Sequence, residues 1–329
     1  MADIKVSVLM AVYNAEQFLD SSLSSLLRQT LTNIEIICVD DASTDASLAL
    51  LHRYTQRDPR IKVLSLSDNQ GQAHARNVAL SVAQGEYICM LDADDTYADD
   101  ALALAAEVLD GEQETDCVLF ECEMVETDGR CRRYHMPSFS TLTGEEAFRL
   151  SLSWTIHGIY MVRRELHIKV PYDDTCRLYS DDNTTRMHYL LSRRVGRCTG
   201  VYRYLQHPAS ATHRVSVRRF DYLTANLSMK MQMVKAGVAA ALIAEYENVR
   251  WLNLVDVYMF YHVHGRQLTS SERRRGLALI RDTWQGIDRT QLDLQLRSKF
   301  GYRPMPTFLL FRLQEWCYFS LRALLGKNR

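Results

Sequence analysis

The sequence lacks the composition of several classes of protein. Its 329 residues include only 14 glycines and 6 prolines, too few for a disordered, collagenous or low-complexity chain. The 39 basic and 40 acidic side chains leave a net charge of −1, whereas a dedicated nucleic-acid-binding domain is usually strongly basic. These absences indicate a globular chain, and its length suits about two domains or one large domain with an extension.

Sequence features of zinc sites, secretion and membrane insertion are also absent. The eight cysteines show no paired spacing and no Cys-x-x-Cys motif, so a zinc site built from thiolates is not expected. No secretion signal is recognisable at the N-terminus, and no apolar run reaches the roughly 18 residues of a membrane span. We therefore expect a cytoplasmic protein, or one associated with the inner face of the cell membrane.

Short apolar runs alternate with amphipathic stretches in the first hundred residues. The runs predict buried strands, and apolar side chains at helical spacing between them predict helices, with Asp45 capping the second helix. Alternation of strands and helices with short connections predicts an α/β fold with a mostly parallel central sheet. The expected strands cover residues 6–12, 34–39, 61–66 and 87–91, and the expected helices cover 16–29, 45–56 and 71–83.

The pattern loosens after residue 115 and becomes mostly helical after residue 216. Thr143, followed three residues later by Glu146, predicts a capping box for a helix within 140–154. We place a boundary near residue 215, between an α/β domain and a helical C-terminal region. Further strands are expected at 117–124 and 159–162, and further helices at 236–244 and 249–262.

Polar clusters follow each of the first four expected strands. In an open parallel sheet, ligands bind beyond the carboxyl ends of the strands, so these clusters are candidates for one site. No G-x-G-x-x-G or G-x-x-x-x-G-K-[ST] sequence accompanies them, which disfavours a Rossmann dinucleotide site and a P-loop. The clusters are Tyr13-Asn14, Asp40-Asp41, Asp68-Asn69 and Asp92-Ala93-Asp94-Asp95.

Asp92 and Asp94 form the strongest single feature of the sequence. Alternation along an extended segment directs both side chains to the same side, where two carboxylates repel each other unless a cation lies between them. Oxygen ligands suit Mg²⁺ or Mn²⁺, and such an ion can in turn hold a diphosphate. A solvated loop or a helix N-cap is the alternative interpretation.

Asp41 and Arg76 add chemistry that suits a nucleotide. A carboxylate at a strand end can accept a hydrogen bond from a base or a ribose hydroxyl, and an arginine can pair with phosphate oxygens. Taken singly, Asp41 is equally typical of a helix cap, and Arg76 of a surface ion pair.

These motifs, in this order, resemble the family 2 glycosyltransferases, which have a GT-A fold and include inverting enzymes of bacterial surface-polysaccharide synthesis. The resemblance is strong over about residues 4–100, continues more weakly to about residue 213 and then stops. It is carried by the segments Val6-Ser7-Val8-Leu9-Met10-Ala11-Val12-Tyr13-Asn14, Val39-Asp40-Asp41-Ala42-Ser43-Thr44-Asp45, Asn69-Gln70-Gly71, Ala75-Arg76-Asn77, Gly85-Glu86-Tyr87-Ile88 and Leu91-Asp92-Ala93-Asp94-Asp95.

The resemblance implies a division of labour along the chain. Residues 1–215 would form the GT-A catalytic domain, with nucleotide-sugar binding in 1–100 and the acceptor side in 101–215. Residues 216–329 would form a helical extension outside the resemblance.

By position, the resemblance also implies roles for residues that follow the first strands. Ala11 and Tyr13 would line the nucleotide base, and Asp41 would bind its uracil-like edge. Asn69 would belong to the nucleotide-sugar site, and Arg76 would contact the base or the diphosphate.

The acidic cluster carries three further implied roles. Asp92 would touch the ribose or the sugar, Asp94 would coordinate Mn²⁺ or Mg²⁺, and Asp95 would help to hold the donor sugar.

A second acidic pair, Asp181 and Asp182, stands where members of the family carry a Glu-Asp pair at a helix start. Asp182 matches the aspartate that acts as the general base, which takes the proton from the attacking acceptor hydroxyl. Asp181 stands where glutamate is commoner and is a candidate for contacts to the acceptor or the diphosphate. The alternative is that both residues only cap the helix that begins near Asn183.

Residues 202–213 are similar to a tyrosine-rich strand of the family and the loop after it. His213 is a candidate metal ligand, and His207 and Ser210 are candidates for contacts to the diphosphate or the acceptor. Trp154 stands where acceptor-side residues usually lie, and an exposed indole face stacks well on a sugar ring. A lone surface histidine and an ordinary core tryptophan are the alternatives.

The last 25 residues, 305–329, combine aromatic, aliphatic and basic side chains. This mixture suits a helix that lies on the surface of an anionic membrane, and a helix packed on the catalytic domain or on a second copy is the alternative. A membrane contact would suit a lipid-linked acceptor.

The sequence therefore predicts an inverting, metal-dependent glycosyltransferase. It would transfer a sugar from a nucleotide-diphosphate donor, most simply a UDP-sugar, to a hydroxyl of a glycan or a lipid-linked glycan, with no nucleic-acid partner. A nucleotidyltransferase and a non-catalytic relative that binds nucleotide-sugars are the alternatives. The donor sugar, the acceptor, the linkage and the oligomeric state are left open.

Overall fold

The computed structural model describes residues 3–207 and 216–326, and the chain divides into two compact units. The sheet unit contains Met1–Arg177 and Thr184–His213, and the helical unit contains Leu178–Asn183 and Arg214–Arg329. The helical unit thus includes a short segment from the middle of the chain as well as the C-terminal third. The functional boundary near residue 215 stays a prediction.

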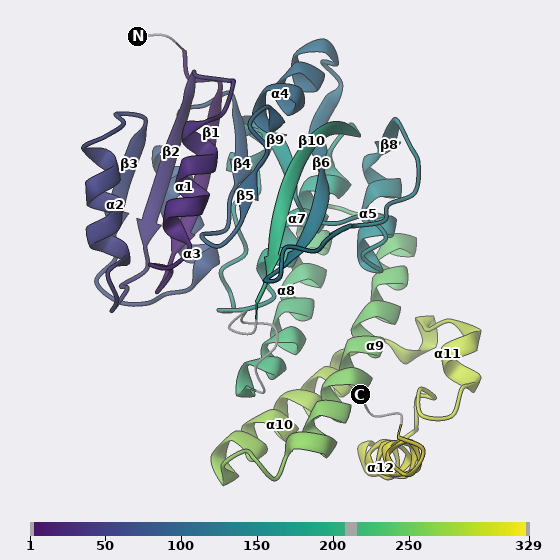
Figure 1. The fold of residues 1–329 in the computed structure, drawn as a ribbon. Coiled ribbons are helices and arrows are strands. Elements are labelled where there is room, and N and C mark those ends of the chain that lie inside the picture. Colours follow the sequence, from purple (N-terminus) through teal and green to yellow (C-terminus); the bar gives the residue numbers. More distant parts are fainter. Residues whose placement is uncertain (1–2, 208–215, 327–329) are drawn as a thin grey trace. The chain divides into compact units, whose positions relative to one another are not determined.

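The ten strands of the described residues form one sheet, which lies in the sheet unit (Figure 1). Its first half holds four parallel strands in the order β3-β2-β1-β4. Next, β9 runs antiparallel between β4 and β6, and β10 runs parallel to β6. The strands are β1 (Val6–Val12), β2 (Ile34–Asp40), β3 (Ile61–Ser65), β4 (Tyr87–Met90), β5 (Thr96–Tyr97), β6 (Thr115–Glu126), β7 (Cys131–Arg133), β8 (Thr141–Thr143), β9 (Tyr160–Arg163) and β10 (Arg194–Gln206).

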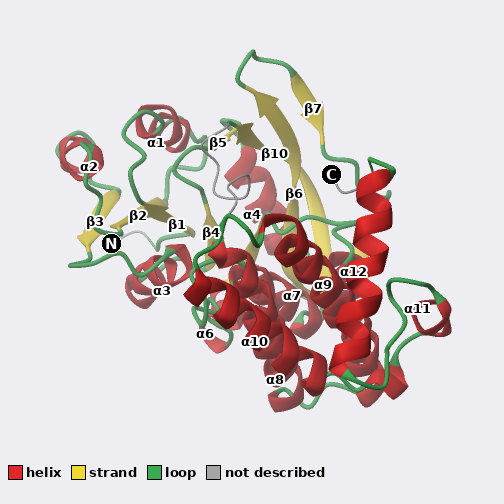
Figure 2. Cartoon of the chain, turned by 90° about the horizontal axis from the view of Figure 1, so that it is seen from below, coloured by secondary structure: helices red, strands yellow, loops and turns green. Residues whose placement is uncertain are grey.

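Helices cover both faces of the parallel strands. In Figure 2, α1 and α2 lie on one face of these strands and α3 lies on the other. The last helix of this series, α7, begins in the segment that belongs to the helical unit and continues in the sheet unit. The helices are α1 (Leu19–Leu27), α2 (Ser47–Thr55), α3 (Gln72–Val82), α4 (Ala101–Gly111), α5 (Gly144–Leu152), α6 (Arg164–Lys169) and α7 (Asp181–Leu191).

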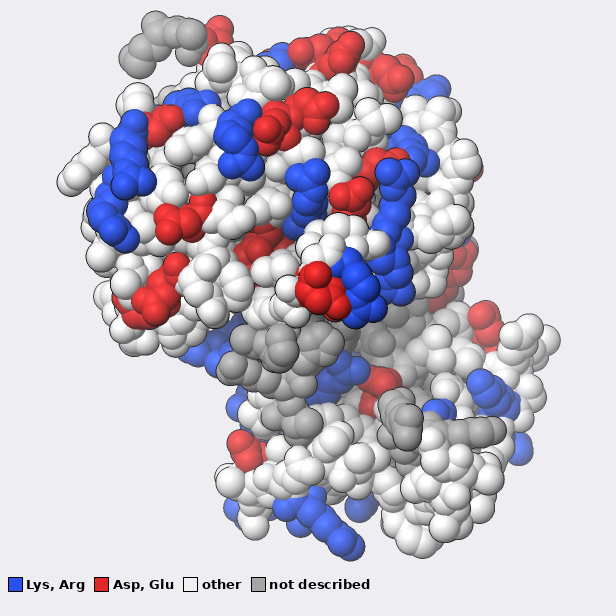
Figure 3. Space-filling model, in the orientation of Figure 1, with Lys and Arg blue, Asp and Glu red and all other residues white. Residues whose placement is uncertain are grey.

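Charged side chains are mixed on the surface of the sheet unit. Figure 3 shows acidic and basic side chains interspersed over the face of this unit that it presents. Residues 1–213 nevertheless carry 20 basic and 31 acidic side chains, whereas residues 214–329 carry 19 basic and 9 acidic ones. The near-zero net charge of the chain therefore hides two parts of opposite sign, −11 and +10.

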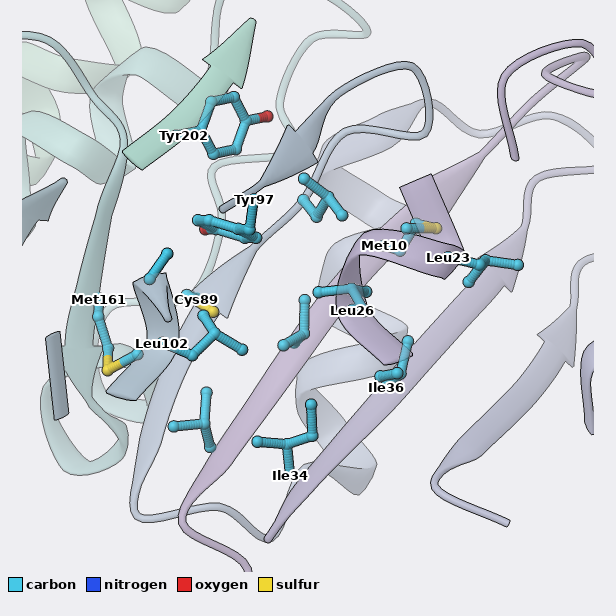
Figure 4. Close-up of a cluster of buried hydrophobic side chains, with 14 of the residues drawn as sticks. Met10, Leu23, Leu26, Ile34, Ile36, Cys89, Tyr97, Leu102, Met161 and Tyr202 are labelled. Atoms are coloured by element: carbon cyan, nitrogen blue, oxygen red, sulfur yellow. The ribbon is translucent and has the colours of Figure 1, made fainter. Parts of the chain in front are cut away.

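Alternate side chains of β1 enter two separate cores. Met10 joins one core with Leu23 and Leu26 of α1 (Figure 4), whereas Leu9 packs on the other face with Ala75 of α3. Because successive side chains of a strand point to opposite faces, a strand buried on both faces is mostly apolar. The polar exceptions Ser7 of β1 and Glu35 of β2 are buried, and the Ser7 hydroxyl donates a hydrogen bond to the Glu35 carboxylate. Full burial of each large apolar side chain is worth about 1.5–3 kcal/mol, so the two cores hold the strand ends in a rigid frame.

The helical unit is organised around α9 (Ala240–His264), which packs against α8, α10 and α12. Its core includes Trp251, Trp284 and Phe311. None of the helices in the described residues combines the length and the apolar character needed to cross a membrane. The other elements are η2 (Val217–Phe220), α8 (Asp221–Lys235), α10 (Ser270–Gly286), η3 (Arg289–Gln291), α11 (Leu294–Ser298) and α12 (Phe308–Leu324).

Most of the predicted strands and the capping box are confirmed. The side chain of Thr143 accepts a hydrogen bond from the Glu146 backbone, and Glu146 accepts one from the Thr143 backbone, as predicted. The prediction that Asp45 caps α2 is wrong, because Ala46 occupies the cap position, although Asp45 still accepts a hydrogen bond from Ser47 N.

The prediction of separate helices at 236–244 and 249–262 is also wrong. Gly237 has a φ of +70°, a left-handed conformation that suits glycine and ends α8, so the first predicted helix spans a break. From Ala240 to His264 the helix is continuous, and Tyr246 and Glu247, between the two predicted helices, are buried. The local sequence pattern around residues 245–248 does not predict a helix, but burial of this turn in the packed unit stabilises one.

Candidate active site

The ends of the parallel strands gather polar side chains at one edge of the sheet. Tyr13 follows β1, Asp41 follows β2, and Asp92 lies two residues beyond β4. Because these strands are parallel, their carboxyl ends meet at the same edge. Tyr13 is 50% exposed there, whereas Ala11 is partly buried within β1.

Asp41 clamps the loop that leads into α3. Its carboxylate accepts hydrogen bonds from the backbone N–H of Gln70 (2.7 Å) and of Gly71 (2.8 Å). The Asn69 side-chain amide donates to the Asp41 carbonyl at 3.2 Å, and Gly71 has a φ of +96° that side chains rarely adopt. Asp41 is 2% exposed, so its carboxylate organises this loop.

Two left-handed residues lie in the loops after β1 and β2. Asn14 has a φ of +50° and Ala42 a φ of +57°, conformations that cost roughly 1–3 kcal/mol for residues other than glycine. The Asn14 side chain accepts a hydrogen bond from Thr44 N at 2.8 Å, and Asn14 N donates to the Ser43 hydroxyl at 3.1 Å. The two loops are thus joined, and backbone strain is concentrated at this edge.

Arg76 is a buried partner of the acidic cluster. It lies on α3 with 2% of its surface exposed, and its Nη2 donates to the Asp92 carboxylate. Its guanidinium also stands 5.5 Å from the ring centroid of Tyr172. This burial excludes a surface ion pair for Arg76 and fixes the direction of the Asp92 side chain.

Asp94 is paired with a histidine from the end of β10. Its carboxylate lies 2.8 Å from Nε2 of His207, whose ring packs 4.7 Å from the ring of Phe18. Burial and the neighbouring charge of Asp92 raise the pKa of Asp94, and the hydrogen bond from His207 offsets part of that shift. The side chains of Asp94 and His207 are 30% and 9% exposed, so this pair is reached from solvent mainly through Asp94.

Asp95 is buried, and its carboxylate is hydrogen-bonded to β10. It accepts hydrogen bonds from the Tyr202 hydroxyl (2.6 Å) and from Leu205 N (2.7 Å). Burial and the charges of Asp92 and Asp94 raise the pKa of Asp95 well above its usual range. The Tyr202 hydroxyl also accepts a hydrogen bond from Asp92 N at 3.3 Å, so Asp95 and Tyr202 together fasten β10 to the acidic loop.

The acidic cluster suits a divalent cation in its chemistry. A cation beside Asp94 would relieve both the burial of its carboxylate and the repulsion from Asp92, and the imidazole of His207 is a ligand that Mn²⁺ accepts. In residues 3–207 and 216–326, no three His, Cys, Asp or Glu side chains are grouped so as to hold a metal. His213 and Ser210 lie outside the described residues.

Asp181 and Asp182 form the first turn of α7, where both side chains are partly buried. They belong to the helical unit, whereas the residues from Tyr13 to Asp95 described above belong to the sheet unit. The helix begins two residues before the predicted Asn183, at Asp181.

Trp154 lies in the sheet unit in a strained conformation. Its φ is +54°, and the Tyr134 hydroxyl donates a hydrogen bond to its carbonyl oxygen. The guanidinium of Arg186 lies 4.9 Å from the centroid of its ring. The ring is partly buried and contacts a cation, which differs from an ordinary core tryptophan.

Sequence reasoning missed the residues that hold the candidate site residues in place. Phe18, Tyr172 and the hydroxyl of Tyr202 contact His207, Arg76 and Asp95 respectively. The resemblance to the family placed Tyr202 in a tyrosine-rich strand, but no local pattern identifies its partner 107 residues away.

The family model for glycosyl transferase family 2 matches residues 7–171, which is half of the chain. The chain belongs to glycosyltransferase family 2. The match covers β1 to β9 and the acidic cluster after β4.

Relatives within family 2 match the chain over different lengths. GlyG, a glycosyltransferase of Streptococcus pneumoniae, is 26% identical over 291 residues, which are 83% of this chain and 93% of GlyG. An uncharacterized glycosyltransferase of Haemophilus influenzae is 45% identical over 97 residues, or 30% of this chain. TuaG, a putative teichuronic acid biosynthesis glycosyltransferase of Bacillus subtilis, is 41% identical over 104 residues, or 32% of this chain. The chain spans only 39% and 41% of the lengths of these last two.

A solved structure with the same fold covers nearly the whole chain. TarS of S. aureus, in a crystal with UDP-GlcNAc, superposes with a TM-score of 0.75 at 20% identity, over 98% of this chain and 92% of that one. The predicted α/β fold of GT-A type with a helical C-terminal extension is confirmed.

Proposed function

We propose that this family 2 member is an inverting glycosyltransferase of polysaccharide biosynthesis that uses a UDP-sugar donor. The acidic edge of the sheet, with Asp92 held by buried Arg76 and Asp94 held by His207, is the observation that carries the proposal. The complex of TarS with UDP-GlcNAc and the kinship with TuaG support the donor class and the pathway class. The acceptor is a hydroxyl of a glycan or a lipid-linked glycan.

The donor is assigned to residues of the sheet unit. Tyr13 and Ala11 would line the uracil, and the loop clamped by Asp41 and Asn69 would border it. Buried Arg76 pairs with the Asp92 carboxylate and neutralises its charge. This pairing would hold the Asp92 side chain in a fixed direction toward the ribose or the sugar. Preorganised partners of this kind remove the cost of ordering these side chains when the donor binds.

Asp95 has a positioning role in this proposal, in place of the direct contact to the donor sugar that the resemblance implies. Both of its carboxylate oxygens serve β10, and the side chain is 1% exposed. It would keep His207 beside Asp94 and thereby shape the diphosphate side of the site.

In the transfer step, Asp182 would take the proton of the acceptor hydroxyl as its oxygen attacks the anomeric carbon. The bond from that carbon to the phosphate oxygen breaks, UDP leaves with the bonding electrons, and attack opposite the leaving group inverts the anomeric centre. Mn²⁺ or Mg²⁺ held by Asp94, with His207 and the undescribed His213 as further candidates, would stabilise the charge of the departing diphosphate. Asp181 and Ser210 are assigned to contacts with acceptor or diphosphate.

The proposal is tested by incubating the purified protein with a panel of nucleotide-sugars and measuring release of the nucleotide diphosphate, with Mn²⁺ and with EDTA. UDP release from one or more UDP-sugars, abolished by EDTA, is expected. Formation of a nucleotide-sugar from a nucleoside triphosphate and a sugar phosphate would point to a nucleotidyltransferase. Absence of both turnover and donor binding would point to a non-catalytic relative.

We also propose that residues 305–329 bind the surface of an anionic membrane. The support is a stripe along α12 whose apolar side chains are exposed, including Leu309 (74%), Trp316 (57%) and Leu324 (84%), together with the net charge of +10 on residues 214–329. Cosedimentation with vesicles of anionic lipid tests this. Deletion of residues 305–329 is expected to abolish binding, and a dimer that is lost on the same deletion would instead show a contact between copies.

A further inference from the structure

Arg186, on α7, is a buried guanidinium without a counterion among the residues that the structure describes. It is 4% exposed and makes no ion pair or hydrogen bond within residues 3–207 and 216–326. Its Nε is shut off from solvent and has no hydrogen-bond partner among these residues. A charge taken out of water without a partner is strongly unfavourable, so such a group needs an anion to complete its surroundings.

A histidine in the same unit shows the same lack of a partner. His157 is 5% exposed, and its Nδ1 accepts a hydrogen bond from Ile159 N at 3.3 Å. Its Nε2 is buried without a partner. Burial lowers the pKa of His157 to about 4, so the ring is neutral at pH 7 and Nε2 carries the proton that Nδ1 lacks. The ring of His157 lies edge-on to that of Tyr134 at 5.2 Å, and the Tyr134 hydroxyl donates to the carbonyl oxygen of Trp154, so His157 and Trp154 share a neighbour.

The segment from Trp154 to Gly158 packs closely against α7. A Cβ on Gly158 would stand 3.0 Å from Oγ1 of Thr185, the residue before Arg186, so glycine permits this close approach. Trp154 takes up a φ of +54° at which its ring lies 4.9 Å from the guanidinium. Strain of this kind is retained where it places a functional side chain.

The register of the sheet brings this segment to the edge that carries the acidic cluster. β9 follows the segment and runs antiparallel to β4, with Met161 opposite Cys89. The start of β9 therefore lies beside the end of β4, after which Asp92 to Asp95 follow. The segment from Trp154 to Gly158, just before β9, is thus at the same edge of the sheet as the acidic cluster.

We infer that Arg186, Trp154 and His157 form an oxyanion-binding site for the acceptor, and that the acceptor is an anionic glycan. This inference rests on the proposed transferase function. The guanidinium would hold the oxyanion, His157 Nε2 would donate to it, and the face of Trp154 would stack on the adjoining sugar or polyol. A phosphate and a sugar carboxylate share this chemistry, and both occur as substituents of anionic polymers.

The test is a binding titration followed by tryptophan fluorescence, with the donor site first saturated with UDP and Mn²⁺. The probes are inorganic phosphate, glucuronate and, as a neutral control, glucose. Quenching by phosphate or glucuronate but not by glucose is expected, and its loss in Trp154→Phe assigns the signal. The anion that binds more tightly, phosphate or glucuronate, shows whether the oxyanion of the acceptor is a phosphate or a sugar carboxylate.

Arg186→Gln is expected to weaken this binding at least about tenfold, the usual worth of a charge-assisted hydrogen bond, while UDP affinity stays unchanged. Arg197→Gln is the matched control, because Arg197 also lies near an aromatic ring, that of Phe139, but is ion-paired with Glu121. Equal anion binding in wild type and Arg186→Gln would overturn the inference. Failure of UDP to bind would instead contradict the proposed function.

Thermal unfolding separates a binding role from a structural one. Arg186→Met keeps the volume and removes the unpaired charge, so an unchanged or higher Tm is expected. A fall in Tm for Arg186→Met together with retained anion binding would show that the arginine serves only the packing around Trp154.

Discussion

The sheet unit and the helical unit differ in how they treat their charged side chains. At the edge of the sheet, Asp41, Asp92, Asp94 and Asp95 each have a specific partner, although the carboxylates crowd together. In the helical unit, Glu247 is neutralised by Arg250 and Lys230, whereas Glu315 is fully buried with Gln314 as its hydrogen-bond partner at one oxygen.

The difference shows where each unit stores unfavourable interactions. In the sheet unit they are repulsion among carboxylates and a buried arginine that has no anionic partner in residues 3–207 and 216–326. In the helical unit they are exposed apolar side chains on α12 and one buried carboxyl group. Under the proposals made above, the sheet unit would bind the substrates and α12 would bind a membrane surface.

Asp182, the proposed base, belongs to the helical unit, whereas the proposed donor-binding residues belong to the sheet unit. If Asp182 is the base, Asp182→Asn is expected to lower kcat by roughly 10²–10⁴-fold, because the acceptor hydroxyl would lose the group that takes its proton. UDP binding by calorimetry is expected to stay unchanged. Asp181→Asn serves as the neighbouring control with a smaller effect, and full transfer activity in Asp182→Asn would place the base elsewhere.

Buried arginines allow the two units to be compared directly. Arg76→Met removes the cation beside Asp92, whose side chain is 35% exposed, and Arg250→Met removes one of the two cations beside buried Glu247, which keeps Lys230. Each variant is therefore expected to lower the free energy of unfolding by less than the roughly 3–5 kcal/mol of a buried charge left unpaired. Only Arg76→Met is expected to weaken UDP binding as well. Urea unfolding and calorimetry measure the two effects, and weaker UDP binding by Arg250→Met would break the comparison.

Two buried groups, one in each unit, are expected to respond to pH in opposite directions. Burial lowers the pKa of His188 to about 4, so the unfolded chain binds this proton first and the stability that neutral His188 contributes is lost as pH falls from about 6.5 toward 4. Burial raises the pKa of Glu315 to about 8, so the stability that protonated Glu315 contributes is fully present below pH 4.5 and is lost as pH rises toward 8. Each group contributes at most about 1.4 kcal/mol per pH unit.

Hydrogen exchange of α12 and of residues 184–191, corrected for the intrinsic effect of pH, measures the two trends separately. Glu315→Gln is expected to make hydrogen exchange in α12 less dependent on pH. The pH dependence of exchange in residues 184–191 is expected to stay unchanged. An α12 that stays equally pH-dependent without the carboxyl group would refute this assignment.

The exposed stripe of α12 gives a smaller effect. Trp316→Ser is expected to weaken binding to anionic vesicles about tenfold, because it removes a large apolar side chain from the stripe. The free energy of unfolding is expected to change by less than about 0.5 kcal/mol, since the side chain is exposed. Unchanged vesicle binding would remove Trp316 from the membrane contact.

Matched helix caps give the smallest effects and test whether the units unfold separately. Thr143 caps α5 in the sheet unit and Thr269 caps α10 in the helical unit, each through a complete capping box. Each threonine-to-alanine change is expected to cost about 1 kcal/mol. If the units unfold independently, calorimetry shows a different transition shifted by each variant, and a common shift would show one cooperative unit.

Short-range patterns in the sequence were sufficient for the strands, most helices and the capping box. The mostly apolar runs of β1 and β2 indicate strands buried on both faces, in which the buried polar residues Ser7 and Glu35 are exceptions. The prediction failed at residues 236–264, where only packing onto α8, α10 and α12 reveals that the turn around Tyr246 is buried and helical. Local propensity there is too weak to decide the outcome.

The ordered motifs along residues 6–95 were enough to assign family, fold and the identity of the acidic residues, because each motif is a few residues long and its chemistry is carried by its own side chains. Folding decided the surroundings of those side chains. It buried Arg76 against Asp92, turned Asp95 toward a tyrosine 107 residues away, and left Arg186 without an anionic partner in the described part of the chain. Such contacts depend on which distant surfaces pack together, and neither hydrophobic periodicity nor motif spacing carries that information.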